Sequence, residues 1–528
     1  MRNFQQPGRS SVFASNGMVA TSHPLAAGEA LAVLKSGGNA VDAALAGAVL
    51  LGVAEPHMTG IGGDLFALVK PAGSPEVVTL NGSGKSPIGL DLDALRGEGL
   101  DRIEPGHPAS ITVPGAVDAI CRLSDRFGKI GLDRVLAPAI HYFDEGVPIA
   151  PRVAMDIASV GATMNPAAKA HYLNSGKAFA VGDLFRLPAQ AEVLRRIAKK
   201  GRMAFYESEV LDDMLATLRA LGGTHTEQDF ATTEATWGTP IRGTYGGFDV
   251  LEHRPNGQGA TAILLLNILK NFDLTSMEQH GAARVHLFAE ATKLAYDARN
   301  RFLADPDHVT KLEHFLSDRT AEQLAALIDP ARALPDPAPL TEDVHKDTVL
   351  ITVVDRDGMA VSLIYSIFAS FGSCIASDKF GILFHNRGSG FNLIPGHPNE
   401  AGPGKRPMHT IIPAMRTKDG RVDMAFGVMG GQYQPTGHAR LLTNLIDYGM
   451  DPQEAVDAPR AFADPISGQL QVESGYSDEI CAKLQELGHD VTRPARPLGG
   501  AQLVMIDHDR GVLIGASDPR KDGAAIGY

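Results

Sequence analysis

Residues 329–367 read DPARALPDPAPLTEDVHKDTVLITVVDRDGMAVSLIYSI, and the change of character inside this stretch decides the fold of the chain. The first part, residues 329–347, is rich in proline and charge, which is typical of an exposed linker. Residues 349–354 are apolar apart from one threonine, and residues 359–367 are again mostly apolar. Asp355-Arg356-Asp357-Gly358 separates them as a turn. The stretch therefore predicts a linker that runs directly into a buried β-hairpin.

Thr348 is the residue at which this linker meets the first strand. Cleavage between Asp347 and Thr348 would leave the threonine hydroxyl beside a new α-amine. A threonine hydroxyl is a weak nucleophile, and an N-terminal amine with a pKa near ~8 can accept its proton without any histidine. The alternative is a structural threonine, because β-branched residues are common at strand starts. The residues alone leave both interpretations open.

The rest of the chain alternates helices with glycine-rich turns. Residues 24–34 predict a helix that starts at a proline and ends at Gly37-Gly38, and Asn39 predicts the N-cap of a second, buried helix. Residues 59–69 (TGIGGDLFALV) predict a glycine-rich turn before an apolar strand, and Gly62-Gly63 lacks the lysine of a phosphate-binding loop. Further helices are expected at residues 133–145, 189–200 and 281–302.

The composition is that of a soluble folded protein, with 44% hydrophobic and 21% charged residues among 528. At this length we expect one large layered domain or two closely packed ones. The net charge of −13 disfavours nucleic acid or a membrane surface as a partner. The sequence shows no apolar run of about 18 residues, no recognisable signal peptide and no CxxC pair among its three cysteines. We therefore expect a cytoplasmic protein that acts on a small molecule.

Several motifs, taken together, resemble the γ-glutamyltranspeptidase family. They occur in the family's order and spacing, and they cover nearly the whole chain. The motifs are GMVATSHPLAAGEALAVLKSGGNAVDAALAGAVLLGVAEPHMTGIGGD (17–64), GGTHTEQDF (222–230), NILKNFD (267–273), AEATKLAYDARNRFLADP (289–306), KRPMHTIIPAM (405–415), MGG (429–431) and GASDPR (515–520).

The resemblance implies a fold, a processing step and a set of partners. The fold is the α/β (α+β) fold of the N-terminal-nucleophile hydrolases, a four-layer αββα sandwich built from two chains of one precursor. Cleavage between Asp347 and Thr348 would give a large chain, 1–347, and a small catalytic chain, 348–528, which form one structural unit and can pair as a dimer of heterodimers. Neither a cofactor nor a metal is expected, because the histidines have no metal-ligand spacing such as HExxH.

Motif register carries the family's catalytic residues onto this chain. Thr348 takes the place of the nucleophile, and Ser366 that of a hydroxyl that hydrogen-bonds the nucleophile. Gly430-Gly431 match the glycines of the oxyanion hole, where backbone N–H groups approach a developing negative charge. Taken alone, Ser366 also fits a serine that bonds its own backbone, and the two glycines also fit a tight turn. The resemblance favours the catalytic interpretation.

The positions that recognise substrate depart from the family. Phe368, Arg387 and Gly390 stand where the transpeptidases have the asparagine, glutamine and aspartate that hold the α-amino group of a γ-glutamyl substrate. Loss of a carboxylate and gain of a guanidinium favour binding of a carboxylate, and Phe368 would narrow the pocket. Arg387 can instead belong to a structural ion pair, and the residues leave both interpretations open.

Two further positions differ. The arginine that binds the α-carboxylate in the family falls near Ile88, and the family's paired serines become His409 and Thr410, where His409 is a second candidate contact for a carboxylate. These changes favour an amidohydrolase for a small carboxylate-bearing amide, with oxamate, cleaved to oxalate and ammonia, as the first candidate. The alternatives are a γ-glutamyltransferase or glutathione hydrolase, a glutaryl-type acylase, and a processed but inactive binding protein. Retention of the catalytic residues argues against the last.

Overall fold

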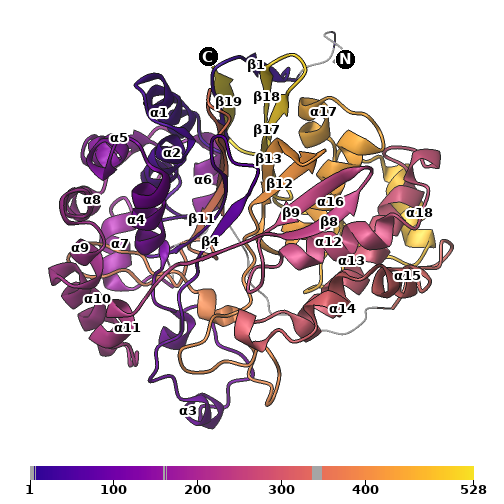
Figure 1. Cartoon of the computed structure of the whole chain (residues 1–528). Helices are drawn as coiled ribbons and strands as arrows, with labels where there is room; N and C mark the ends of the chain where they lie inside the picture. The colour runs from indigo at the N-terminus through magenta and orange to yellow at the C-terminus, as the bar shows by residue number, and fades with distance from the viewer. Residues whose placement is uncertain (1–4, 6–7, 159–160, 162, 336–347) are drawn as a thin grey trace.

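Two large antiparallel sheets lie face to face in the computed structural model, which describes residue 5 and residues 8–158, 161, 163–335 and 348–528 (Figure 1). The first sheet has the order β1 (Val12–Ala14), β18 (Val512–Ser517), β17 (Gly500–Asp507), β13 (Arg421–Met429), β12 (Ala414–Lys418), β9 (Phe248–Glu252) and β8 (Ile241–Tyr245). The second has the order β19 (Ala524–Gly527), β2 (Met18–Thr21), β10 (Val349–Val354), β11 (Ala360–Ser366), β3 (Asp64–Lys70), β4 (Val78–Gly82) and β7 (Thr236–Gly238).

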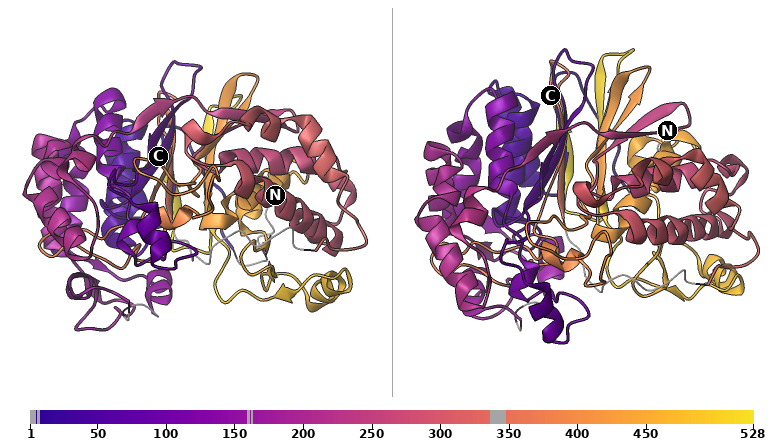
Figure 2. Two further views of the ribbon diagram at one scale, coloured as in Figure 1. Left: turned by 90° about the horizontal axis from the view of Figure 1, so that it is seen from below. Right: turned by 60° about the horizontal axis from the view of Figure 1, so that its bottom comes forward.

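Helices cover the outer face of each sheet, as the views of Figure 2 show. Beside the second sheet lie α1 (Pro24–Lys35), α2 (Ala40–Ala54), α4 (Ala116–Phe127), α5 (Leu132–Glu145), α6 (Pro151–Ile157), α7 (Pro166–Tyr172), α8 (Pro188–Lys200), α9 (Met203–Tyr206), α10 (Glu209–Ala220) and α11 (Glu227–Ala231). Beside the first sheet lie α12 (Gly259–Leu269), α13 (Ala282–Phe302), α14 (Leu312–Leu316), α15 (Asp318–Ala325), α16 (Gln434–Ile446), α17 (Pro452–Asp457) and α18 (Asp478–Glu486).

Smaller elements complete the molecule. Helix α3 (Leu92–Gly97) lies below the sheets in the view of Figure 1. Two small sheets flank the layers, and they are formed by β14 (Ala461–Ala463), β15 (Leu470–Val472) and β16 (Val491–Thr492), and by β5 (Val147–Pro148) and β6 (Leu184–Phe185).

Apolar side chains from both sheets meet in the space between them. Met18, Leu68 and Val354 of the second sheet pack in one cluster with Met415 and Val504 of the first. A strand that is covered on both faces needs apolar residues on both, which is why residues 349–354 show no polar alternation. Because β10 lies in the middle of the second sheet, the residue before it, Thr348, lies at a buried strand end.

The expected mixed α/β class, with two large antiparallel sheets, is confirmed. Strands β10 and β11 pair as the expected hairpin, with Val349 opposite Tyr365. Helix α1 begins at Pro24, and the side chain of Asn39 caps α2 in a reciprocal pair of hydrogen bonds with Asp42. The helices expected at 133–145, 189–200 and 281–302 are α5, α8 and α13, whose ends lie within one residue of those bounds.

The expected linker extends into residues that the structure does not describe. Residues 336–347, which include Asp347 and the scissile bond before Thr348, lie outside the described residues. Among the described residues, none of the helices is both long and apolar enough to cross a membrane.

Candidate active site

Thr348 and Ser366 lie side by side at the ends of two paired strands. The β10–β11 register ends with Val349 opposite Tyr365, so that the next residue of each strand is Thr348 and Ser366. Their hydroxyl oxygens are 3.4 Å apart, and both residues are buried in the intact chain. Ser366 Oγ also accepts a hydrogen bond of 2.9 Å from the Phe368 N–H, which fixes its position. The structure therefore brings together the two hydroxyl groups that were predicted from the sequence to interact.

The glycine-rich turn before β3 allows the backbone to pack against this strand end. A Cβ on Gly62 would lie 2.2 Å from the carbonyl oxygen of Leu383, and one on Gly63 would lie 2.3 Å from that of Ser366. Both approaches are far shorter than any real Cβ contact, so these positions require glycine. The motif thus serves close packing of backbone on backbone, which agrees with the argument against a phosphate loop.

A buried carboxylate, Asp64, lies at the centre of the polar groups under Ser366. Its Oδ2 is 3.1 Å from Arg387 Nε, 2.9 Å from His409 Nε2 and 3.7 Å from His385 Nδ1. Burial alone would raise the pKa of Asp64, but His385, His409 and Arg387 hold it well below its ordinary value. Burial, together with the charge of Arg387, lowers the pKa of His409 to about 3. His409 is therefore neutral at pH 7 and donates to Asp64.

Arg387 is an internal residue whose donors are directed at protein groups. Nε contacts Asp64, Nη1 is 3.1 Å from Thr410 Oγ1, and Nη2 is 3.4 Å from Ser366 Oγ. The ring of Phe368 covers the guanidinium at 4.1 Å, and neither residue lines the pocket described below. The structure thus contains the ion pair that the sequence left as an alternative. The ring of Phe368 stacks on this arginine, and its expected role in narrowing the substrate pocket stays a prediction.

The paired glycines follow the end of β13, beside the same strand end. Met429 packs with Leu350 of β10 and Ile364 of β11, and the next residues, Gly430 and Gly431, have φ of +116° and +54°. Among the hydrogen bonds of loops, turns and helix caps in the described residues, none uses the N–H of either glycine as donor. Two backbone donors in such a turn can hold an oxyanion.

We predict that Gly430→Ala lowers kcat about 100-fold, because it displaces the peptide that carries these donors. A Cβ on Gly430 would lie 2.8 Å from the Gly499 Cα, and the positive φ adds strain. Gly449→Ala is the matched control, since Gly449 also has a positive φ (+58°) but open space around its Cβ. Steady-state kinetics on the processed enzymes tests this, and a kcat within about threefold of wild type would contradict the role.

A pocket of about 660 Å³ opens next to these groups. Gly430, one of the paired glycines, belongs to its lining, and so does Ala369, which is three residues after Ser366 in the sequence. Its lining is mixed, with an apolar part formed by Met58, Met429, Tyr433, Phe462 and Leu498 and a charged part formed by Arg152, Asp156, Asp464, Arg496 and Lys521. A pocket of this volume holds a ligand considerably larger than oxamate. The expectation of a small substrate pocket stays a prediction.

The remaining expected positions fall outside this pocket. Ile88 is 69% exposed, and Gly390 ends the short helix η4 (Arg387–Gly390), with its carbonyl bonded to Asn399. The sequence argument did not single out Asp64 or Lys521. Asp64 is the last residue of the GIGGD motif and Lys521 directly follows GASDPR, so an ionisable residue at the end of a motif was the available signal.

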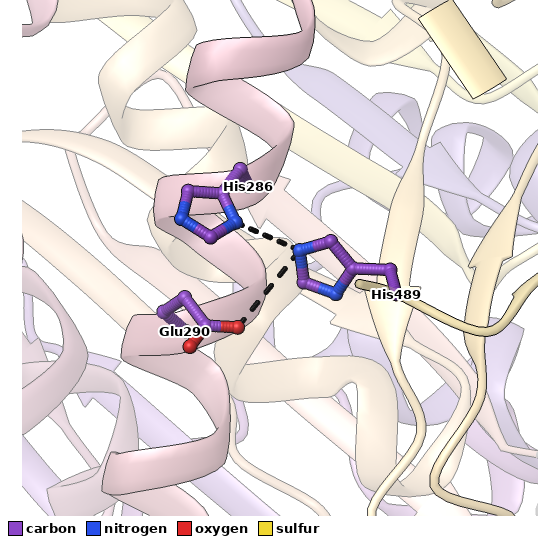
Figure 3. Close-up of side chains that lie close together, drawn as sticks. All are labelled: His286, Glu290 and His489. Carbon is purple, nitrogen blue, oxygen red and sulfur yellow. Dashed lines mark hydrogen bonds and ion pairs between the residues drawn. The ribbon is translucent and has the colours of Figure 1, made fainter. Parts of the chain in front are cut away.

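One cluster of side chains has the composition of a metal site. His286 and Glu290 of α13 converge with His489, and one ligand atom from each lies within 4.8 Å of the others (Figure 3). These atoms already bond protein groups. His286 Nδ1 is 2.8 Å from His489 Nε2, His286 Nε2 is 2.8 Å from the Asp329 carbonyl, and Glu290 accepts from Lys293 Nζ at 2.8 Å.

This cluster connects the two regions that are expected to become the large and the small chain. Glu290 also accepts a hydrogen bond from the N–H of Leu334, one of the last described residues before the expected cleavage site, while His489 belongs to the small-chain region. A metal ion would have to displace the ammonium of Lys293 from Glu290. We therefore interpret the cluster as a hydrogen-bonded connection, and the expectation that the enzyme needs no metal stays a prediction.

Comparison with known proteins points to one family across the chain. The gamma-glutamyltranspeptidase family model matches residues 26–528. The glutathione hydrolase-like YwrD proenzyme of Bacillus subtilis is 36% identical, with 98% of this chain and 99% of the relative covered. The oxamate amidohydrolase proenzyme of Klebsiella pneumoniae is 35% identical, with coverage of 98% and 100%. The crystal structure of a cephalosporin acylase from Bacillus halodurans is similar with a TM-score of 0.92 at 36% identity, over 100% of this chain and 99% of that one.

Proposed function

Since the chain belongs to the gamma-glutamyltranspeptidase family, whose members are self-processing hydrolases, we propose that Thr348 is both the residue exposed by self-cleavage after Asp347 and the catalytic nucleophile. The observation that carries this proposal is the 3.4 Å contact between Thr348 Oγ1 and Ser366 Oγ, at a strand end beside a pocket and the two oxyanion glycines. The products would be a large chain, 1–347, and a small chain, 348–528, packed as one unit.

The chemistry follows from these positions. The freed α-amine of Thr348 accepts the hydroxyl proton while Oγ1 attacks the amide carbonyl. The N–H groups of Gly430 and Gly431 hold the oxyanion, and the amine product leaves with the proton. Water then attacks the Thr348 ester and releases the acid, so that the enzyme returns to its starting state. Ser366 orients the nucleophile through the contact between the two hydroxyls.

The substrate we propose is an amide whose acyl group carries a free carboxylate but no α-amine. Phe368, Arg387 and Gly390 have no carboxylate side chain that could hold an ammonium group, and Arg387 already bonds the nearby carboxylate of Asp64. Oxamate is the smallest such substrate and the first candidate from the sequence. The pocket volume of about 660 Å³ is a specific observation in favour of a second candidate, a longer glutaryl-type amide.

A matched pair of substrates tests the proposal, because a glutaryl anilide and a γ-glutamyl anilide differ only in the α-amine. We expect kcat/KM for the glutaryl compound to exceed that for the γ-glutamyl compound at least about tenfold, since an unpaired ammonium is costly to bury. Release of ammonia from oxamate, measured in parallel, separates the two candidates. A clear preference for the γ-glutamyl anilide would replace the proposal with glutathione hydrolase or γ-glutamyltransferase activity.

A further inference from the structure

Lys521 is a buried cation in the lining of the pocket. It lies between β18 and β19, directly after the GASDPR motif, and only 5% of its surface is exposed. Burial of an ammonium group is unfavourable unless hydrogen bonds or an opposite charge compensate it. The ammonium group of a buried lysine in the lining of a pocket therefore requires an anion or hydrogen-bond acceptors as partners.

Two observations place Lys521 beside residues that pack next to the candidate catalytic groups. A Cβ on Gly500 would lie 2.9 Å from the Lys521 Cγ, and Gly500 pairs with Met429, the residue before Gly430. At its other end, the Lys521 Nζ is 3.3 Å from the sulfur of Met58. The carbonyl of Met58 accepts the N–H of Ile367, the residue after Ser366. The side chain therefore packs near Gly500 at one end and contacts Met58 at the other, and these two residues pair with the chain neighbours of Gly430 and Ser366.

The partners of the Lys521 ammonium within the described residues are weak. A thioether sulfur is a poor acceptor, and the nearest carboxylate oxygen, that of Asp156, is 3.8 Å away. Asp156 forms its shortest contacts with Arg152, whose Nε lies 3.0 and 2.9 Å from the two carboxylate oxygens. His57 Nε2 lies 3.5 Å from the same carboxylate. Three groups thus share one carboxylate, and Lys521 has the longest contact of the three.

The other carboxylates near the pocket accept hydrogen bonds from groups other than Lys521. Asp522 accepts the backbone N–H of Arg152, and Asp464 accepts from the N–H of Ile466 and from Ser467 and Gln471. Burial would raise the pKa of Asp156, but His57, Lys521 and Arg152 hold it well below its ordinary value, so Asp156 stays ionised at pH 7. Because its contacts are a thioether sulfur at 3.3 Å and a shared carboxylate at 3.8 Å, the Lys521 ammonium keeps donors for a second anion.

We propose that Lys521 binds the carboxylate of the acyl group and is the residue that selects acidic amides. The family's arginine falls near Ile88, which is 69% exposed, and Arg387 is directed at Asp64, so neither position supplies this contact. The inference rests on the proposed function, because the acyl carbonyl must lie at Gly430 for its carboxylate to reach Lys521.

Lys521→Met tests the proposal with two substrates of equal length, glutaryl and pentanoyl p-nitroanilide, which differ in one carboxylate. We expect the ratio of kcat/KM for the glutaryl over the pentanoyl compound to fall about 10- to 100-fold, mostly through KM. Lys521→Arg keeps the charge and should retain most of the ratio. An unchanged ratio in Lys521→Met would overturn the proposal.

A second measurement uses the wild type and does not depend on the folding of a variant. Glutarate should inhibit wild-type hydrolysis of the pentanoyl compound at least about tenfold more strongly than valeramide, which has the same length and no charge. Equal inhibition would also overturn the role of Lys521. Failure of the proposed function looks different, because a wild-type chain that stays uncut and hydrolyses neither anilide would contradict the role of Thr348 itself.

Discussion

Thr348→Ala should leave a single uncut chain of 55.9 kDa, whereas the wild type should give two fragments, the smaller of which begins at Thr348. Alanine removes both the hydroxyl that attacks the preceding peptide bond and the hydroxyl that attacks substrate. Removal of a covalent nucleophile typically costs about 10⁴-fold or more in rate, so hydrolysis of a glutaryl anilide should become undetectable. Intact mass spectrometry and the anilide assay measure the two effects on the same preparation.

Thr348→Ser is the matched control, since it keeps the hydroxyl and removes only a methyl group. We expect it to cleave itself and to retain measurable hydrolysis, because Ser366 and the oxyanion glycines remain in place. A wild-type protein that is active but uncut would show that the free α-amine is not the base. A Thr348→Ala protein that is still cut between the same residues would show that another group attacks the scissile bond.

The hairpin that carries Thr348 was predictable because its determinants are local. A continuous apolar run, a turn of aspartate and glycine, and a second apolar run specify β10 and β11 without reference to the rest of the chain. The same holds for α2, where Asn39 and Asp42 cap the first turn within four residues of sequence. Local side-chain to backbone hydrogen bonds and periodicity can be read from one sequence.

The surroundings of the nucleophile depend on distant pairs and were not predictable in this way. Arg387 and Asp64 are 323 residues apart in the sequence, and only the β3–β11 pairing brings Asp64 opposite Ser366. Nothing in the local pattern at Arg387 shows whether its guanidinium meets a protein carboxylate or a substrate carboxylate. The same is true of Lys521 and Asp156, which approach each other from β18–β19 and from α6.

Asp64→Asn should lower the free energy of unfolding by about 3–5 kcal/mol, because it removes one partner of a fully buried ion pair and keeps the shape. The substituted amide would leave the guanidinium of Arg387 without a carboxylate at 3.1 Å and would weaken the bond to His409. The free energy of unfolding is measured by urea denaturation in the Thr348→Ala background, so that every protein compared is a single uncut chain. Asp297→Asn, which breaks a solvent-exposed pair with Arg301, is the control and should cost less than about 1 kcal/mol.

The pH dependence of this loss has a definite sign. Because the folded state holds the pKa of Asp64 below its ordinary value, the unfolded chain binds the proton more tightly. The stability that Asp64 contributes is then fully present above the unfolded pKa of about 3.9, and it decreases as the pH falls below that value toward the folded pKa. Between pH 5 and pH 3, the wild-type background should therefore lose stability more steeply than Asp64→Asn. In Asp64→Asn, the free energy of unfolding should still decrease with falling pH, but less steeply, because the pKa of Asp156 is also depressed. Equal slopes of stability against pH in the two proteins would show that Asp64 is not ionised in the folded protein.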